Sequence, residues 1–243
     1  MDSGYYAACA GLAAQTQGLE LVANNLANLN SAGYKGQKAI FRSLLAAFSH
    51  NGNALNRAVN DFGVLGGSRL DSSSGNLAQT GNPLDLAIAG GGFFVLQSGK
   101  TTLYSRNGGF HRTEAGDLVT SHGDAVMGEQ GPITLPNGVV SVSADGTISV
   151  DGAVAAKLRL VEFAPDVELM AHGDATYLAP AEKALPAAAS SIRQGMLESS
   201  NVSAVESVVQ LISVQRNAEM MQRALTLFDS QLNQIAAQDL PRV

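Results

Sequence analysis

The sequence predicts an α+β protein in which long N- and C-terminal helices form a coiled-coil-like helical domain, with an inserted antiparallel all-β domain between them. Near both ends of the chain, apolar residues recur at alternating spacings of three and four, which is the heptad pattern of packed helices. Between about residues 75 and 180 the period changes to the two-residue alternation of half-buried strands. We therefore expect a terminal helical domain made of 1–36 and 195–243, a connecting helix or extended arm over 37–74, and a β-rich outer domain over 75–194.

The N-terminal helix is expected from about Ser3 to Asn30. Its heptad positions, spaced 4, 3, 4, 3, 4 and 3 residues apart, are Tyr5, Cys9, Leu12, Thr16, Leu19, Ala23 and Leu26. Thr16 alone departs from the apolar pattern, and Cys9 fits as a small buried residue. Gly33 then supplies the left-handed conformation that a helix end favours.

The middle of the chain carries strand and turn patterns. Leu84, Leu86 and Ile88 alternate with less apolar residues, and Asp-Gly pairs occur at 145–146 and 151–152. An Asp-Gly pair between alternating strands indicates a type I′ hairpin, because that turn requires positive φ at both central residues. Turns every 8 to 15 residues or so predict an antiparallel sandwich or barrel-like domain.

The C-terminal helix shows the clearest pattern. Its apolar positions, spaced 3, 4, 3, 4, 3, 4 and 3 residues apart, are Leu211, Val214, Ala218, Met221, Leu225, Phe228, Leu232 and Ile235. Neither Gly nor Pro interrupts the chain between Gly195 and Pro241, so one helix from about Asn201 to Gln238 would be roughly 57 Å long. Two amphipathic helices packed on a single globule are the alternative. However, a β-domain of this size is only about 35 to 40 Å across, so we expect the helix to project.

Composition and charge exclude several classes of protein. The net charge of −6 and pI of about 5.1 argue against a nucleic-acid partner. Because no run of 18 apolar residues occurs, no membrane insertion is expected. The apolar stretch 5–14 is preceded only by the negative charge of Asp2, whereas a cleaved signal peptide needs a positive region there.

No catalytic or metal-binding pattern stands out, so we expect no enzyme, no cofactor and no metal. The four histidines are far apart in the sequence, unlike zinc ligands. The glycines 90–92 follow a strand, but Phe93 and Phe94 begin another strand. A phosphate-binding loop would need a helix N-terminus at that point.

Three asparagines lie in the last turns of the predicted N-terminal helix, where Asn is a poor helix former. Asn24 and Asn28 share one face, and Asn25 lies beside them. One interpretation is that they loosen and cap the helix end before Gly33. The other is that their amide groups, which both donate and accept hydrogen bonds, link neighbouring subunits in a packed array.

The stretch 22–35, VANNLANLNSAGYK, closely resembles the N-terminal signature of the bacterial flagellar rod and hook proteins. Three further stretches resemble motifs of the same family in the same order, at 75–94, 104–120 and 195–216. The size resembles that of rod members rather than the much longer hook members. The proximal rod is favoured over the distal rod, because the region between Lys35 and Gly75 is shorter than distal members have.

The resemblance implies a structural subunit of the periplasmic rod of the basal body. It implies assembly with other copies of itself and with other rod proteins, after unfolded export by the flagellar type III export apparatus and without a cleaved signal peptide. The rival class is a secreted coiled-coil adhesin or binding module with a β head, which would require a cleaved signal. The residues that we expect at assembly interfaces are Leu12, Leu19, Asn24, Asn25, Leu26, Asn28, Gly33, Tyr34, Leu211, Val214, Met221, Leu225, Phe228, Leu232 and Ile235.

Overall fold

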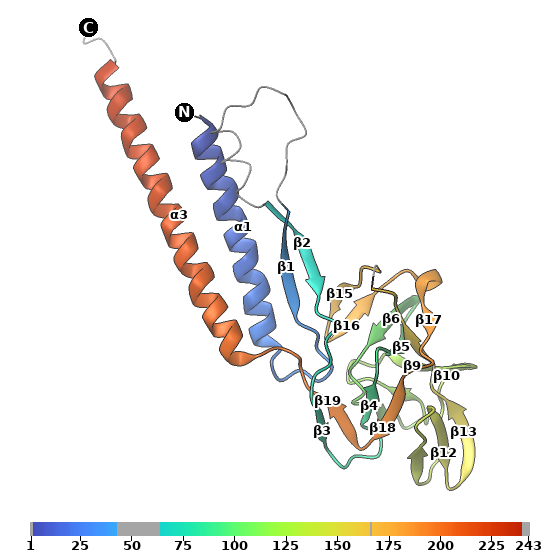
Figure 1. Ribbon diagram of the computed structural model, residues 1–243. Helices are drawn as coiled ribbons and strands as arrows, with labels where there is room; N and C mark the ends of the chain where they lie inside the picture. Colours follow the sequence, from blue (N-terminus) through green and yellow to red (C-terminus); the bar gives the residue numbers. More distant parts are fainter. Residues whose placement is uncertain (1, 43–63, 166, 240–243) are drawn as a thin grey trace. The chain divides into compact units, whose positions relative to one another are not determined.

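The computed structural model describes residues 2–42, 64–165 and 167–239 (Figure 1). The chain divides into two compact units. The first unit comprises residues 1–26, 37–69 and 203–243. The second unit comprises residues 27–36 and 70–202.

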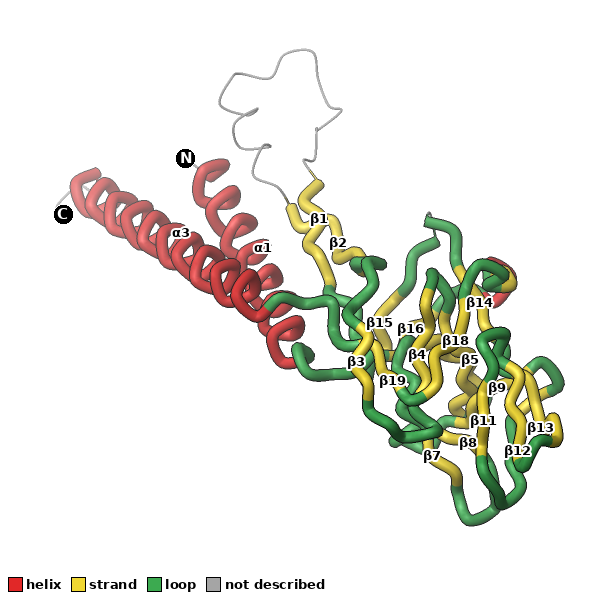
Figure 2. The backbone as a smooth tube through the Cα atoms, turned by 60° about the horizontal axis from the view of Figure 1, so that its bottom comes forward, coloured by secondary structure: helices red, strands yellow, loops and turns green. Residues whose placement is uncertain are grey.

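The first unit contains two helices and a β-ribbon. Helix α1 spans Asp2–Ala27, helix α3 spans Ala204–Asp239, and strands β1 (Gln37–Arg42) and β2 (Val64–Leu70) pair with each other. Helix α1 lies between α3 and the ribbon (Figures 1 and 2). Part of the predicted connecting arm is therefore an extended ribbon, and residues 43–63 of the arm lie outside the described residues.

The two helices pack antiparallel through a small-residue face of α1. A Cβ atom placed on Gly11 would lie 3.6 Å from Cε of Met221, and one on Gly18 would lie 3.8 Å from Cγ1 of Val214. The partner numbers fall on α3 as they rise on α1, so the helices run in opposite directions. Ala14 is buried on the same face of α1.

The predicted fold class is wrong, because the terminal helices do not form a coiled-coil-like domain. Among the α1 residues with described side chains, the buried ones all lie off the predicted heptad, namely Gly11, Ala14, Gly18, Val22 and Asn25. The predicted heptad residues Leu12, Leu19 and Leu26 are only half-buried, and Thr16 and Ala23 are exposed.

Helix α3 also lacks the burial of a coiled coil, whose large heptad side chains insert between those of the partner. Among its residues with described side chains, only Ser207 is buried. Helix α1 has 26 residues against 36 in α3, so the two helices are not matched in length. The first unit also includes β-structure and is not purely helical.

The second unit is β-rich, and its described strand pairs are antiparallel. Its strands are β3 (Leu77–Gln79), β4 (Leu86–Ala89), β5 (Phe93–Ser98), β6 (Thr101–Ser105), β7 (His111–Arg112), β8 (Leu118–Val119), β9 (Ala125–Gly128), β10 (Gly131–Pro132), β11 (Val140–Val142), β12 (Thr147–Val150), β13 (Ala153–Lys157), β14 (Leu160–Glu162), β15 (Met170–Gly173), β16 (Thr176–Leu178), β17 (Leu185–Pro186), β18 (Ser191–Gln194) and β19 (Met196–Glu198). A single turn of 3₁₀-helix, Ala181–Lys183, precedes β17.

One ten-stranded sheet dominates this unit. Its main path runs β15-β16-β6-β5-β9-β8-β7, with β10 beside β9, β14 beside β5 and β17 beside β14. A three-stranded sheet β11-β12-β13 and the pairs β18–β4 and β19–β3 complete the unit. The strands β3 and β19 therefore bring residues near 78 and 197 together.

The hairpin predicted at 151–152 is confirmed. Asp151 and Gly152 connect β12 to β13 with φ values of 49° and 84°, so both central residues adopt the left-handed conformation of a type I′ turn. At the other Asp-Gly pair, the Asp145 carboxylate accepts hydrogen bonds from the backbone N–H and the hydroxyl of Thr147 at 3.2 and 2.8 Å.

Strand β5 is buried on both faces, which explains its unbroken apolar run. Phe94 and Leu96 belong to one hydrophobic cluster, whereas Phe93 and Val95 belong to a second cluster with Tyr177. Successive residues of a strand point to opposite faces, so β5 separates two cores. The larger cluster also contains Leu86, Ile88, Leu103, Phe110, Leu118, Val126, Ile133, Leu135, Ile148, Val150, Leu158 and Ile192.

Candidate functional site

The motif-bearing stretches of the sequence meet at a buried cluster of charges in the second unit. Lys35, Arg106 and Glu198 lie on three of those stretches, yet their side chains are only 1%, 2% and 1% exposed. Lys35 and Glu198 are 163 residues apart in the chain. Charged side chains are almost never fully buried unless they are paired. We call these three residues the buried charge cluster.

Glu198, the last residue of β19, is the centre of this cluster. Its Oε1 accepts hydrogen bonds from Lys35 Nζ at 2.7 Å and from the backbone N–H of Gly75 at 2.8 Å. Lys35 Nζ also donates to the carbonyl oxygen of Ser73 at 2.7 Å. One carboxylate oxygen therefore joins the segment before β3 to the segment that follows α1.

Arg106 holds the cluster against the sheet. Its guanidinium donates to the carbonyl oxygens of Ile88 and Gly90 at 3.2 and 2.5 Å, and it lies over the Phe93 ring at 5.3 Å from the centroid. Its Nη1 is 3.4 Å from Glu198 Oε2, an ion-pair contact without hydrogen-bond geometry, since that oxygen has no hydrogen bond among the described residues. Charge attraction rather than hydrogen bonding therefore links Arg106 to Glu198.

Burial shifts the pKa values of the groups around the cluster. It lowers the pKa of Lys35, while the hydrogen bond and the negative charge of Glu198 oppose that shift. Burial likewise lowers the pKa of Arg106 against the attraction of Glu198. The hydroxyl oxygen of Tyr177 accepts the backbone N–H of Lys35 at 2.8 Å, and burial raises the pKa of this phenol.

Gly33 and Tyr34, which we predicted at an assembly interface, lie inside the second unit. Gly33 has φ of 69°, and a Cβ atom there would lie 2.2 Å from the backbone nitrogen of Asn107. Its own N–H donates to the carbonyl oxygen of Glu198 at 2.7 Å. The side chain of Tyr34 is buried, and burial raises its pKa. Both residues therefore position the chain beside the buried charge cluster.

The three predicted asparagines have different surroundings. Asn25 is buried, donates to the carbonyl oxygen of Gln37 at 2.8 Å and accepts the N–H of Gln37 at 2.9 Å. This pair of bonds fixes the end of α1 to the start of β1. Asn28 accepts a hydrogen bond from the Ser31 hydroxyl at 3.0 Å, and Asn24 is exposed.

The predicted helical interface residues lie along α1 and α3 in the first unit. Half-buried positions are Leu12, Leu19, Leu26, Leu211, Val214, Met221 and Leu225. For Phe228, Leu232 and Ile235 the structure describes only the helical backbone, so their side chains lie outside the described residues. Their role in assembly stays a prediction.

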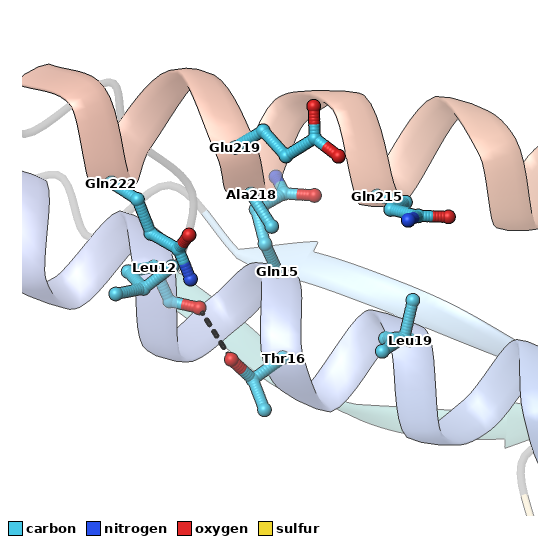
Figure 3. Close-up of a pocket in the computed structure, with 8 residues that line it drawn as sticks. All are labelled: Leu12, Gln15, Thr16, Leu19, Gln215, Ala218, Glu219 and Gln222. Atoms are coloured by element: carbon cyan, nitrogen blue, oxygen red, sulfur yellow. Dashed lines mark hydrogen bonds between the residues drawn. The ribbon is translucent and has the colours of Figure 1, made fainter.

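A groove of about 340 Å³ runs along the α1–α3 pair (Figure 3). Its residues from α1 are Leu12, Gln15, Thr16 and Leu19, and those from α3 are Gln215, Ala218, Glu219 and Gln222. The lining combines three apolar side chains with amides and a hydroxyl, and Glu219 supplies its single charged side chain. We call this feature the inter-helix groove.

Two groups of residues were not predicted from the sequence. The first is the buried charge cluster together with Asn201, whose amide donates to the carbonyl oxygens of Asp71 and Ser73 and accepts the N–H of Gly36. All four residues lie within the stretches that resemble family motifs, and this was the available signal. The second group is an exposed apolar face of α3 that lies outside the predicted heptad positions and includes Val205, Val209, Ile212, Met220 and Leu227.

Within the described ranges, no group of three or more His, Cys, Asp or Glu residues could hold a metal ion. None of the described helices is both long and apolar enough to cross a membrane.

Comparisons with known families match three parts of the chain. Residues 6–35 match the flagella basal body rod protein family. Residues 87–155 match the flagellar hook protein FlgE/F/G D1 domain, and residues 193–238 match the flagellar basal body rod FlgEFG protein C-terminal family. These regions include all three residues of the buried charge cluster.

Relatives match most of the chain at about one third identity. The basal-body rod protein FlgG of Agrobacterium fabrum is 33% identical, over 91% of this chain and 94% of its own. FlgF of Salmonella typhimurium is 33% identical over 94% and 95%, and FlgF of Mesorhizobium japonicum is 31% identical over 90% and 89%. At this identity and coverage, the chain belongs to the family of flagellar basal-body rod proteins.

Proposed function

We propose that this chain is a structural subunit of the bacterial flagellar basal-body rod and acts without enzymatic chemistry. The observation that carries the proposal is the coverage of the matches, since relatives named as rod proteins align with about nine tenths of both chains. The aligned part includes both terminal regions, which match rod families separately. A shared architecture from end to end supports a shared structural role.

In the proposed assembly, the terminal segments 1–36 and 195–243 form the rod core, and the β-rich segment 75–194 lies outside it. The subunit contacts other copies of itself and other rod proteins. The half-buried residues of α1 and α3, such as Leu19 and Leu225, retain apolar surface that a neighbour can cover. Fully burying one such side chain contributes about 1.5 to 3 kcal/mol, so several contacts per subunit suffice for a stable shaft.

The proximal position is proposed over the distal one. The alignment with FlgG of A. fabrum runs over 253 positions but uses 91% of this chain, so about 30 positions have no counterpart here. The same comparison gives about 19 such positions for FlgF of S. typhimurium and about five for FlgF of M. japonicum. Fewer insertions relative to FlgF support a proximal, FlgF-type subunit. A distal, FlgG-type subunit is the second candidate, because the identities to both proteins are nearly equal.

The proposal includes export by the flagellar type III apparatus and residence in the periplasmic part of the basal body. A secreted adhesin would instead lose an N-terminal signal peptide. Mass spectrometry of the chain in purified basal bodies tests this directly. Intact Met1 in basal-body fractions agrees with the proposal, whereas a processed chain found only in the culture medium contradicts it.

A substitution tests the role of the helices. Leu225→Asp places a carboxylate on a half-buried position of α3 and should abolish both incorporation into basal bodies and swimming, while the β-rich unit stays folded. Thr226→Asp changes the neighbouring exposed position and should leave both intact. Normal swimming of the Leu225→Asp strain would contradict assembly through this helix.

A further inference from the structure

The chain contains three Asn-Gly pairs, at 51–52, 107–108 and 137–138. In such a pair the backbone nitrogen of glycine can attack the side-chain amide of asparagine, because glycine has no Cβ atom to hinder the approach. The product is a cyclic imide, which water opens to aspartate or isoaspartate. The pair at 51–52 lies outside the described residues, and the other two pairs have opposite surroundings.

The pair at 107–108 is held inside the β-rich unit. Gly108 is buried, and a Cβ atom on it would collide with the carbonyl oxygen of Leu86. The side-chain oxygen of Asn107 accepts the N–H of Gly109 at 3.0 Å, and the N–H of Asn107 donates to the Ser105 hydroxyl at 3.0 Å. The amide of Asn107 can therefore turn toward the nitrogen of Gly108 only when this part of the sheet opens.

The pair at 137–138 lies on a bend that leads into strand β11. Asn137 and Gly138 are both exposed. Among the residues that the structure describes, none forms a hydrogen bond with the side chain of Asn137 or with the N–H of Gly138. Both reacting groups of the cyclisation are therefore accessible in the folded chain.

The fold requires glycine at position 138. Gly138 has φ of 153°, and a Cβ atom on it would lie 2.6 Å from Cγ1 of Val150 and would also collide with the carboxylate of Asp151. Any other residue would combine backbone strain with these collisions. The dipeptide that favours cyclisation is thus a consequence of how the bend packs on the sheet.

We propose that Asn137 is a site of spontaneous covalent modification, at which the side-chain amide is lost and the backbone is rerouted through isoaspartate. The backbone nitrogen of Gly138 loses its proton to water and forms a bond with Cγ of Asn137. The bond from Cγ to the side-chain nitrogen breaks, and that nitrogen leaves as ammonia. Water then hydrolyses either carbonyl of the imide. The reaction consumes water, releases ammonia and involves no oxidation or reduction.

The modification changes a contact within the three-stranded sheet β11-β12-β13 (Figure 2). The N–H of Val139 donates to Oδ1 of Asp151 at 2.9 Å, and the N–H of Asp151 donates to the carbonyl oxygen of Val139 at 3.0 Å. Isoaspartate adds a carbon atom to the backbone two residues before this pair of bonds, together with a negative charge that the Asp151 carboxylate repels. The link between β11 and the β12–β13 hairpin should therefore weaken.

Timed incubation of the full-length chain, followed by digestion with trypsin and mass spectrometry, tests the proposal. Trypsin places Asn107 on the peptide 107–112 and Asn137 on the peptide 113–157, and neither peptide contains another asparagine. Loss of the amide raises the mass of the peptide. Electron-transfer fragmentation locates the change and distinguishes isoaspartate from aspartate. A sample kept unfolded in urea gives the rate of each pair without the influence of the fold.

In the folded chain, Asn137 should convert within about threefold of its rate in urea, whereas Asn107 should be slowed at least about tenfold, because it reacts only from locally opened molecules. Asn137→Gln is the matched variant, since glutamine keeps an amide at the exposed position but would have to form a larger ring. Position 137 of this variant should stay unmodified. Hydrogen exchange of the Val139 amide should accelerate on ageing of the wild type and should not change on ageing of Asn137→Gln.

Each contrary result overturns a definite part of the proposal. Conversion of Asn137 in urea but not in the folded chain would show that the bend keeps its two reacting groups apart. Equal rates for Asn107 and Asn137 in the folded chain would show that the fold does not select the site. Conversion of Asn137 with unchanged exchange at Val139 would contradict the proposed effect on the sheet.

Discussion

Lys35 Nζ lies 2.7 Å from Glu198 Oε1, and both side chains are 1% exposed. The pair joins the segment that follows α1 to the strand that precedes α3. Taking ions out of water is costly, and attraction between them offsets that cost only when geometry and hydrogen bonds are good. The additional bonds to Ser73 and Gly75 satisfy this condition.

Loss of the Glu198 charge should strongly destabilise the second unit. Glu198→Gln leaves the charges of Lys35 and Arg106 buried without an anion, and removal of one partner of a buried pair costs about 3 to 5 kcal/mol. Urea unfolding of the full chain measures this loss. Glu129→Gln is the control, because its contact with Lys157 at 3.1 Å is largely exposed and should contribute less than about 1 kcal/mol. Equal effects of the two substitutions would contradict a structural role for the cluster.

Stability should fall at alkaline pH partly through Tyr177. Burial raises the pKa of this phenol above its ordinary value of 10.0, so the unfolded chain releases the proton first as the pH rises. The contribution is complete below about pH 10 and is lost above it, as the pH rises toward the raised pKa. In unfolding titrations, Tyr177→Phe should show a shallower decline above pH 10. The informative quantity is the slope of the free energy of unfolding against pH. Its absolute value is not informative, because Tyr177→Phe also removes the hydrogen bond from Lys35 and so lowers stability at every pH.

Gly33→Ala should destabilise the chain by more than about 2 kcal/mol, since it adds both backbone strain and a collision with Asn107. Gly81→Ala separates these two effects. Gly81 has φ of 78°, but a Cβ atom there would meet nothing within 4 Å, so only the strain remains. The midpoint temperature of thermal unfolding should therefore be well below that of Gly81→Ala in the Gly33→Ala variant.

Gly18→Ala should stabilise helix α1, whereas the two preceding glycine substitutions should lower stability. Its added Cβ would lie 3.8 Å from Val214, an ordinary contact, and Ala is favoured over Gly inside a helix by about 0.5 to 1 kcal/mol. We expect slower amide exchange along α1 in this variant. Faster exchange would show that the backbones of α1 and α3 approach too closely for a methyl group.

Asn25→Ala should release the start of β1. The Gln37 amide loses its acceptor, so its hydrogen exchange should accelerate. Asn25→Asp is the matched variant, because the carboxylate can still accept from Gln37 N–H but cannot donate to the Gln37 carbonyl oxygen. Protection of the Gln37 amide should be retained better in the Asp variant than in the Ala variant.

The sequence predicted features that depend on local pattern. The Asp151–Gly152 turn followed from the backbone conformation that the turn demands, and the apolar run of β5 followed from strand composition. The packing of the helices did not follow. The heptad pattern predicts packing through Leu12 and Leu19, whereas α1 buries the smaller Gly11, Ala14 and Gly18. Two helices can meet on either face, and periodicity alone does not select between them.

The buried charge cluster could not be located from sequence for a different reason. Lys35, Arg106 and Glu198 are residue types that usually lie on the surface, and only contacts between segments far apart in the chain bring them together. The motif-bearing stretches marked these positions without indicating their roles. Gly33 and Tyr34 make contacts within the second unit, and their predicted place at an interface between subunits stays a prediction.

The order of the cluster residues along the chain sets a condition on folding. Both positive groups of the cluster, Lys35 and Arg106, precede residue 107, whereas Glu198, whose carboxylate pairs with them, comes much later in the chain. A chain emerging from its N-terminus therefore cannot complete the interior of the β-rich unit until nearly all of that unit has appeared. Fragments that end before Glu198 would have to bury uncompensated positive charge, so commitment to the native state is delayed until the segment leading into α3 is present.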